Sequence, residues 1–409
     1  MPERLSLADI QAAAARIAGG VARTDCSLSE VFSARTGAQI YLKSEHRQRT
    51  GSFKERGARN ALLQLSDEQK KRGVIAASAG NHALALARHG KLLGIPVTVV
   101  MPLFAPMMKV TRCRDYGVRV IQHGAHLLEA KMHAQALVES EGLRYINGYD
   151  DLEIIAGAGT ISLEMLEAVP DLDVLVVPVG GGGLIAGMAV AAKALKPSIR
   201  IVGVEPERAA SFTAALKAGA PAPAEMSPTL ADGLAVSVVG SNAFAIARPL
   251  IDDLVRVDEH DLALAILRLV EQEKSVVEGA GAAGVAALLA GKVGGIAGKK
   301  VGTVLCGGNI DSTMLGRIIQ RGLAADGRLC RFSAHISDRP GGLAAFSKVL
   351  AEEGASVVDI THDRIFGGDE IANVSVLCTV ETRDHAHVAA LKARLDREGF
   401  RAAFHAGVR

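Results

Sequence analysis

Short runs of β-branched residues alternate with amphipathic helical segments from residue 39 to about residue 310, and this alternation limits the possible folds more than any other feature. Apolar strands of this length that are separated by helices are typical of parallel sheets covered on both faces. The pattern therefore predicts an α/β fold with mostly parallel strands. The expected strands are 39–43, 73–77, 96–101, 118–122, 173–179, 200–205 and 300–306.

The tail of the chain follows a different order, and the change predicts a domain boundary near residue 328. The expected elements are a strand at 329–337, a helix at 341–354, strands at 356–364 and 371–382, a helix at 384–399 and a strand at 400–404. "FGGD" at 366–369 supplies the turn between the two middle strands. This βαββαβ order indicates a ferredoxin-like domain over residues 329–409.

Composition and charge exclude several classes of protein. A net charge of +2 is too balanced to indicate nucleic acid or an anionic membrane as a partner. The charged N-terminus argues against a secretory signal, and the apolar stretches are too short to span a bilayer. Five scattered cysteines without a CxxC spacing make a disulfide framework or a zinc site unexpected. We therefore expect a protein of the reducing cytoplasm.

Lys54, in "GSFKERGA" (51–58), directly precedes an alanine-rich helical pattern. A lysine is disfavoured at the positive end of a helix. The same field, together with the apolar neighbour Phe53, lowers the pKa of an amine and favours formation of a Schiff base. Taken alone, the motif is much more typical of a solvated surface lysine.

Two loops between an expected strand and an expected helix are suited to anions. "SAGNHA" (78–83) offers backbone N–H groups with the side chains of Ser78 and Asn81, although the same residues also favour a plain turn. "VGGGGL" (179–184) brings four glycines to the start of a helix, where the backbone can approach a phosphate closely. The run lies in mid-chain, so a phosphate site is better supported than a dinucleotide fingerprint or a flexible linker.

Two further glycine-rich segments follow. "VEGAGAAG" (277–284) is explained by tight helix packing as well as by a ligand. "VLCGGNID" (304–311) ends an expected strand at Cys306, which is either a small buried apolar residue or a weak hydrogen-bonding group beside a ligand.

Taken in order over residues 5–320, these segments resemble the serine/threonine dehydratases, a fold-type-II group of pyridoxal-phosphate enzymes. The segments that carry the resemblance are "LKSEHRQRTGSFKERGA", "SAGNHA", "NGYDDLEIIAGAGT", "PVGGGGL", "GVEPE", "LADGLAV" and "CGGNID". The resemblance implies a catalytic domain over residues 1–328, similar to the tryptophan synthase β subunit. It implies two subdomains, with a small one at about 45–150 inserted in the large one.

The resemblance also implies roles for single residues. Lys54 would form the Schiff base with pyridoxal 5′-phosphate, Phe53 would lie against the cofactor ring, and Asn81 would bond its hydroxyl. Cys306 would face the pyridine nitrogen. The phosphate would be held by Gly180, Gly181, Gly182 and Gly183, and the substrate carboxylate by the loop of Ser78, Ala79, Gly80, Asn81 and His82.

The activity implied by this resemblance is a threonine ammonia-lyase that eliminates water from L-threonine, giving 2-oxobutanoate and ammonia, and that also converts L-serine to pyruvate. Two alternatives remain open: an ammonia-lyase for another 3-hydroxy amino acid such as 3-hydroxyaspartate, and a non-catalytic amino-acid sensor. The tail resembles an ACT domain, which implies either binding of a branched-chain amino acid as effector or a dimerisation module without ligand. A homodimer or homotetramer is expected.

The chain departs from the pattern of its relatives at two positions. Serine racemases of the group carry a serine, the acid/base for the second face, where this chain has Ala79, so racemase activity is not expected. The divalent-cation site of the group includes two acids. This chain keeps the first as Glu205 but has Ser211 in place of the second, which leaves metal binding in doubt.

Overall fold

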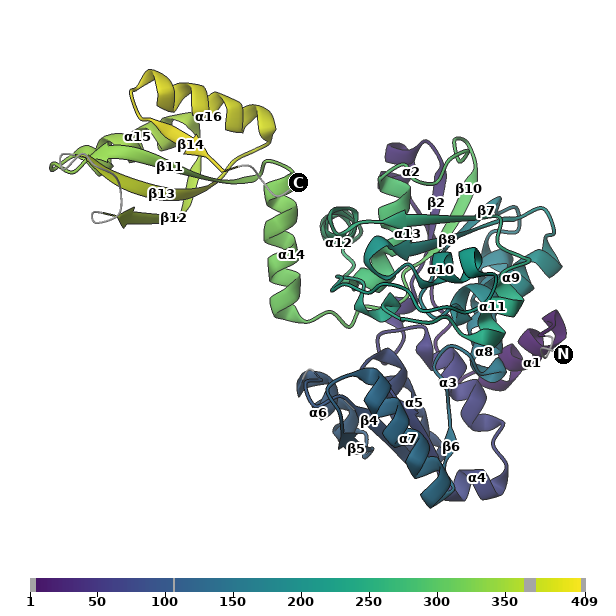
Figure 1. Ribbon diagram of the computed structural model, residues 1–409. Coiled ribbons are helices and arrows are strands. Elements are labelled where there is room, and N and C mark those ends of the chain that lie inside the picture. The colour runs from purple at the N-terminus through teal and green to yellow at the C-terminus, as the bar shows by residue number, and fades with distance from the viewer. Residues whose placement is uncertain (1–4, 106, 364–372, 406–409) are drawn as a thin grey trace. The chain divides into compact units, whose positions relative to one another are not determined.

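The computed structural model describes residues 5–105, 107–363 and 373–405, and the chain divides into two compact units between Ile310 and Asp311 (Figure 1). The first unit contains a six-stranded and a four-stranded sheet, and the second contains a four-stranded sheet. Among the helices of the described residues, none is both long and apolar enough to cross a membrane.

The larger sheet of the first unit has the strand order β1-β2-β10-β7-β8-β9. Every neighbouring pair is parallel except β1 with β2. Its central strands are almost wholly apolar because helices cover both faces. The strands are β1 (Cys26–Ser29), β2 (Gln39–Lys43), β7 (Val174–Pro178), β8 (Arg200–Pro206), β9 (Asp253–Val257) and β10 (Lys300–Val304).

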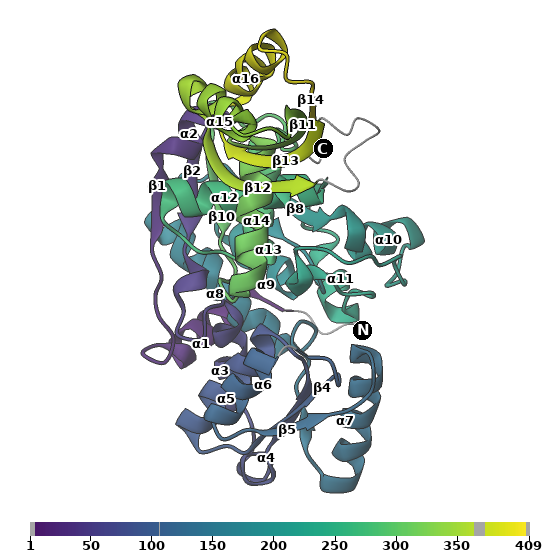
Figure 2. The same cartoon turned by 90° about the vertical axis from the view of Figure 1, so that its left-hand side faces the viewer.

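The smaller sheet is all parallel, in the order β5-β4-β3-β6. Figure 2 shows α7 (Leu127–Glu141) on one side of β4 and β5, and α5 and α6 on the other. Successive side chains of a strand point to opposite faces of the sheet, so helices are needed on both sides. Ile75 and Val100 pack against α7, while Val74 and Val99 pack against α5. The elements are β3 (Val74–Ala77), β4 (Val97–Met101), β5 (Arg119–Gln122), β6 (Arg144–Tyr145), α5 (Asn81–Leu93) and α6 (Met107–Asp115).

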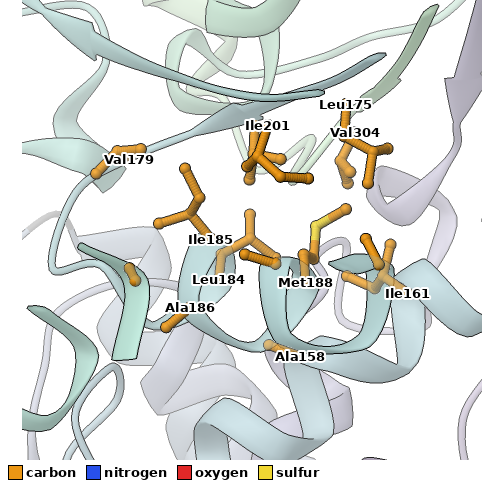
Figure 3. Close-up of a cluster of buried hydrophobic side chains, with 14 of the residues drawn as sticks. Ala158, Ile161, Leu175, Val179, Leu184, Ile185, Ala186, Met188, Ile201 and Val304 are labelled. Atoms are coloured by element: carbon orange, nitrogen blue, oxygen red, sulfur yellow. The ribbon is translucent and has the colours of Figure 1, made fainter. Parts of the chain in front are cut away.

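Helix α9 (Gly183–Leu195) is buried against the larger sheet, and this packing positions the glycine run that precedes it. Figure 3 shows Leu184, Ile185 and Met188 of α9 facing strand residues that include Leu175, Ile201 and Val304. The other helices of this unit are α1 (Leu7–Ile17), α2 (Glu30–Thr36), α3 (Lys54–Leu63), α4 (Asp67–Arg72), α8 (Leu152–Ala168), α10 (Ser211–Ala218), α11 (Ser241–Ala247), α12 (Glu259–Glu273) and α13 (Gly279–Leu289), with short 3₁₀ turns at Glu45–Arg47, Glu207–Ala209 and Asp232–Leu234.

The second unit begins with α14 (Ser312–Ala325) and continues in the expected βαββαβ order. Its antiparallel sheet, β12-β13-β11-β14, packs one face against α15 and α16 through a core around Phe332 and Phe346. The elements are β11 (Leu329–Ser337), α15 (Gly342–Glu353), β12 (Ser356–Asp363), β13 (Asn373–Glu381), α16 (His385–Arg397) and β14 (Ala402–Phe404).

Comparison with the sequence expectations confirms the α/β class and the ferredoxin-like order. All seven strands expected in the first unit are present within two residues at each end, but β1, β6 and β9 were not expected. These three lie at sheet edges, where strands are short or partly exposed and their apolar pattern is weak. The turn expected at 366–369 lies outside the described residues.

Candidate active site

A cavity of about 380 Å³ lies at the carboxyl ends of strands from both sheets of the first unit. Open α/β sheets bind ligands at this edge because the loops after parallel strands converge there. The cavity brings together every residue predicted from sequence to contact cofactor or substrate. Its lining includes Phe53, Lys54, Ser78, Ala79, Gly80, Asn81, His82, Gly180, Gly181, Gly182, Gly183 and Cys306.

Lys54 is the first residue of α3, and its amine points into the cavity rather than into bulk solvent. Its Nζ donates a 2.6 Å hydrogen bond to the carbonyl oxygen of Gly148 and lies 4.9 Å from the centre of the Phe53 ring. Burial lowers the pKa of Lys54 to about 8, although the nearby carboxyl of Glu278 acts in the opposite direction. An amine with this pKa is partly unprotonated near neutrality and is therefore a usable nucleophile and base.

His82 supports the segment that holds the lysine. Its Nε2–H donates to the carbonyl oxygen of Ile146, at 3.2 Å, and its ring packs so closely on Gly148 that an added Cβ there would lie 2.7 Å from the ring. Burial, reinforced by Lys54, lowers the pKa of His82 to about 3, so the imidazole is neutral. His82 therefore fixes the Gly148 carbonyl rather than contributing charge.

The glycine run Gly180–Gly183 connects β7 to α9. Gly182 has φ +93°, a conformation that favours glycine, and the first N–H groups of α9 have no acceptor within the helix. A Cβ at Gly181 would lie 2.3 Å from Cγ of Tyr149, and one at Gly183 would lie 2.3 Å from the Tyr149 carbonyl oxygen. Tyr149 thus packs directly on the run, which leaves a narrow cup of backbone donors at the positive end of a helix.

Asn81, Glu278 and Cys306 form the polar floor of the cavity. Asn81 Nδ2 donates to Oε1 of Glu278 at 2.6 Å. Burial, and then the charge of Asp232, raises the pKa of Glu278 to about 7. Burial, followed by the influence of Glu278, also raises the pKa of Cys306, so its thiol is neutral. The polar groups at this end of the cavity are thus an amide, a carboxyl whose pKa lies near neutrality and a neutral thiol.

Glu278 and Tyr149 were not assigned from the sequence. Glu278 directly precedes α13 inside "VEGAGAAG", and its side chain makes no capping hydrogen bond to that helix, so nothing in the local sequence indicates its place in the cavity. Tyr149 lies in the motif "NGYDD", which showed no local sign of chemistry. Each residue reaches the cavity only through packing against a distant segment.

The two positions considered for a metal lie elsewhere, and neither lines the cavity. The Glu205 carboxylate accepts hydrogen bonds from the N–H groups of Phe212 and Thr213, at 2.5 and 3.0 Å, and from the Thr213 hydroxyl at 2.6 Å. It thereby satisfies free donors in the first turn of α10. Within the described residues no cluster of three His, Cys, Asp or Glu side chains is arranged to hold a metal ion.

Comparison with known proteins identifies the family. The family described as pyridoxal-phosphate dependent enzyme matches residues 17–307, which is most of the chain. The chain belongs to this family. A pyridoxal-phosphate cofactor requires a lysine that forms a Schiff base with it and a loop that binds its phosphate.

Relatives and solved structures give a finer comparison. The chain is 43% identical to an L-threonine ammonia-lyase of Thermotoga maritima, covering 97% of this chain and 98% of the relative. An L-threonine ammonia-lyase of Geobacter sulfurreducens is 42% identical, covering 96% and 97%. Among solved structures, maize serine racemase has a TM-score of 0.74 at 37% identity, covering 79% of this chain and 99% of that one. Threonine deaminase isoform 2 of Solanum lycopersicum has a TM-score of 0.72 at 37% identity, covering 76% and 91%. The first unit therefore has the fold-type-II architecture.

The cavity fits pyridoxal 5′-phosphate, the cofactor of this pyridoxal-phosphate dependent enzyme. Lys54 supplies a buried amine of lowered pKa, and Gly180–Gly183 supply backbone donors at the start of a helix. The glycine run is suited to a doubly charged anion, because its backbone N–H groups lie at the positive end of α9 and no side chain caps them. Cofactor and amine chemistry thus meet in one cavity.

Proposed function

We propose that this protein is an L-threonine ammonia-lyase that converts L-threonine to 2-oxobutanoate and ammonia, with L-serine as a second substrate. The observation that carries the proposal is the convergence of Lys54, Gly180–Gly183 and Cys306 on one cavity, in a chain that is similar to L-threonine ammonia-lyases over nearly its whole length. Lys54 is the catalytic residue.

Lys54 acts first as the attachment point of the cofactor and then as a base. When bound, pyridoxal phosphate supplies the electron sink that stabilises negative charge at the substrate Cα. The Lys54 amine would take up the proton at the substrate Cα, and its pKa of about 8 suits this task near neutral pH. The Gly148 carbonyl holds the amine in place between these events.

The remaining residues bind and orient. Gly180–Gly183 would hold the cofactor phosphate, Phe53 would lie against its ring, and the segment 78–82 would receive the substrate carboxylate through its backbone N–H groups. The β-hydroxyl of threonine leaves as water, and the unsaturated amine that is released loses ammonia in water. The reaction is balanced: the elimination removes one water from threonine, and hydrolysis of the released amine takes up one water and gives ammonia and 2-oxobutanoate.

The neutral thiol of Cys306 favours elimination. Cys306 would lie beside the pyridine nitrogen of a bound cofactor, and burial raises the pKa of its thiol, so it would not keep that nitrogen protonated as a carboxylate would. The sink is correspondingly weaker, and the negative charge at Cα is short-lived. Expulsion of the β-hydroxyl is then favoured over transamination.

A substrate panel tests the proposal. We expect release of 2-oxo acid from L-threonine and less from L-serine, with a loss of at least about 10³-fold in Lys54→Ala. Visible absorbance of the bound cofactor in the wild type, absent in Lys54→Ala, accompanies this result. A protein that binds the cofactor but turns over neither amino acid would contradict the assignment, and an inert protein without visible absorbance would favour the amino-acid sensor.

A second candidate substrate is 3-hydroxyaspartate. Lys109 and Lys131 also line the cavity, and such cations are suited to a second carboxylate. The Lys109 amine is already 3.4 Å from a carboxylate oxygen of Asp232. Turnover of 3-hydroxyaspartate without turnover of L-threonine, in the same panel, would select this candidate.

We further propose that residues 1–328 form the catalytic domain and 329–409 an ACT-like regulatory domain that binds a branched-chain amino acid. The strand-to-helix turn before α15 supports this, because Gly341, with φ +96°, lets ligand groups approach the backbone. Calorimetry with L-isoleucine and L-valine, alongside kinetics, tests it. Absence of heat and unchanged kinetics with both would leave only a dimerisation role.

The assembly and location are part of the same proposal. We expect a homodimer or homotetramer, which sedimentation would establish. All five cysteines are free thiols, which suits the reducing cytoplasm.

A further inference from the structure

A chain of side-chain hydrogen bonds leads from α6 to the cavity and includes a residue that the mechanism does not use, Asn309. Arg112 Nη1 of α6 donates to Asn309 Oδ1 at 2.9 Å. Asn309 Nδ2 donates to Asn81 Oδ1 at 2.8 Å, and Asn81 Nδ2 donates to Glu278 at 2.6 Å. We call these four residues the amide chain. It connects α6, the loop after β10, the start of α5 and the start of α13.

The direction of every bond in the amide chain is set by its neighbours. Arg112 has donors only, so it must face the oxygen of Asn309. Asn309 Nδ2 also donates to the carbonyl oxygen of Thr50, at 2.7 Å, and a carbonyl oxygen can only accept. Turning the Asn309 amide over would place donors against Arg112 and acceptors against both Thr50 and Asn81. Asn309 is therefore held in one orientation.

That orientation passes to Asn81. Because its Oδ1 accepts from Asn309, its Nδ2 must face the cavity side and Glu278. One hydrogen of Nδ2 is bonded to Glu278, and the second has no acceptor in the described part of the chain. Asn81 can therefore offer the ligands in this cavity a donor and not an acceptor, and it is suited to an anionic oxygen.

The backbone is shaped around Asn309 as well. Gly51 has φ +80°, and a Cβ there would lie 2.7 Å from Asn309 Oδ1. The segment just before Lys54 lies against the segment that carries Asn309, through bonds from Gly308 N to Gly51 O and from Phe53 N to Cys306 O. Asn309 thus contacts both the segment that leads into the catalytic lysine and the loop that receives the substrate.

We propose that Asn309 is a positioning residue of the active site, which orients the Asn81 amide so that it presents a hydrogen-bond donor to an oxygen of the bound cofactor or substrate. The inference deepens the proposed function and rests on it. Asn309 acts through Asn81, while Arg112 and Thr50 keep Asn309 itself from turning.

The test changes the two hydrogen-bond partners of the Asn81 amide, first Asn309 alone and then Asn309 together with Glu278. Asn309→Asp keeps the shape and the acceptor for Arg112 but places an oxygen against Asn81 Oδ1. The Asn81 amide then turns over and presents an acceptor. We expect the dissociation constant of pyridoxal phosphate, the KM for L-threonine or both to rise about 10- to 100-fold. Both are measured, the first by visible absorbance.

Asn309→Asp combined with Glu278→Gln is the decisive variant. At a pH above the pKa of about 7 of Glu278, its carboxylate can only accept and clashes with the oxygen of a turned Asn81 amide. The new amide at 278 can present either an N–H or an oxygen to Asn81, so it accepts either orientation and relieves this clash. In the double variant, the constant that rises in Asn309→Asp should therefore return part of the way to its wild-type value. Constants within twofold of wild type in Asn309→Asp, or a double variant no better than the single one, would overturn the inference.

A matched control separates positioning from stability. Asn60 also bonds through both ends of its amide, to the Glu153 carbonyl oxygen and to Arg16, but neither of these partners lines the cavity, whereas the partner Asn81 of Asn309 does. Asn60→Ala should lower the melting temperature and leave the dissociation constant of pyridoxal phosphate and the KM for L-threonine unchanged. Changes in these two constants as large as those caused by Asn309→Asp would count against the inference. If Asn309→Asp does not fold, Arg112→Met removes the first donor and should raise the same constants to a smaller extent, and an unchanged result there is contrary evidence. The dissociation constant of pyridoxal phosphate is measured without turnover. A wild-type protein that binds the cofactor but does not convert L-threonine would therefore contradict the proposed function and not this inference.

Discussion

The Lys54 amine and the Gly148 carbonyl oxygen lie 2.6 Å apart, although 94 residues separate them along the chain. Lys54 begins α3, whereas Gly148 follows the edge strand β6 of the smaller sheet. Nothing in either local sequence specifies the contact. It exists because β6 pairs with β3 and so delivers residues 146–149 to the cavity.

The lowered pKa of Lys54 predicts how the cofactor-free protein captures pyridoxal phosphate. Capture needs the unprotonated amine, so its rate should rise with pH and level off above about 8. At pH 7.5 about a quarter of the amine is then unprotonated, against about 0.1% for an ordinary lysine. Stopped-flow absorbance over a pH series measures the midpoint. A midpoint near that of a free lysine would contradict the prediction, and Lys54→Ala is the control.

Gly181→Ala should weaken cofactor binding. The added Cβ would lie 2.3 Å from Tyr149 Cγ, so either the ring or the glycine run must move. We expect the dissociation constant of pyridoxal phosphate to rise by about tenfold or more, because small displacements are costly in such sites. Adding Tyr149→Ala should restore part of the affinity. Gly294→Ala, where an added Cβ meets nothing within 4 Å, is the matched control.

Removal of Arg56 should destabilise the first unit strongly. The Arg56 guanidinium is fully buried between the carboxylates of Glu45, at 2.8 Å, and Glu164, at 2.7 Å. Arg56→Ala leaves buried negative charge unpaired, and the free energy of unfolding should fall by about 3–5 kcal/mol. Urea denaturation measures it. The exposed pair of Arg23 with Glu167 provides the comparison, since Arg23→Ala should cost less than about 1 kcal/mol.

Treatment with EDTA should leave the activity unchanged. The Glu205 carboxylate is occupied by three donors at the start of α10, and the residue that begins this helix is Ser211 rather than an acid. Dialysis against EDTA followed by addition of Mg²⁺ or Ca²⁺ tests this, and a several-fold stimulation by either ion would show it to be wrong. Glu205→Gln should cost about 1 kcal/mol of stability through the lost helix contact.

Local pattern was sufficient for much of the site. Lys54, "SAGNHA", the glycine run and Cys306 were each found from residue type and position after an expected strand, and all line one cavity. Loops at the carboxyl ends of parallel strands converge in any sheet of this kind, so their meeting follows from the α/β alternation itself. The specific roles given to these residues remain predictions.

The sequence by itself determined the strand and helix order, the α/β class, the ferredoxin-like tail and the residues with distinctive chemistry, because periodicity and turn composition act over a few neighbouring residues. Only the tertiary structure decided that the Gly148 carbonyl holds Lys54, that Tyr149 packs on the glycine run, that Glu205 caps a helix, and that Asn309 joins Arg112 to Asn81. Asn309 and Asn81 are 228 residues apart, and their bond depends on how two sheets pack and not on any local preference.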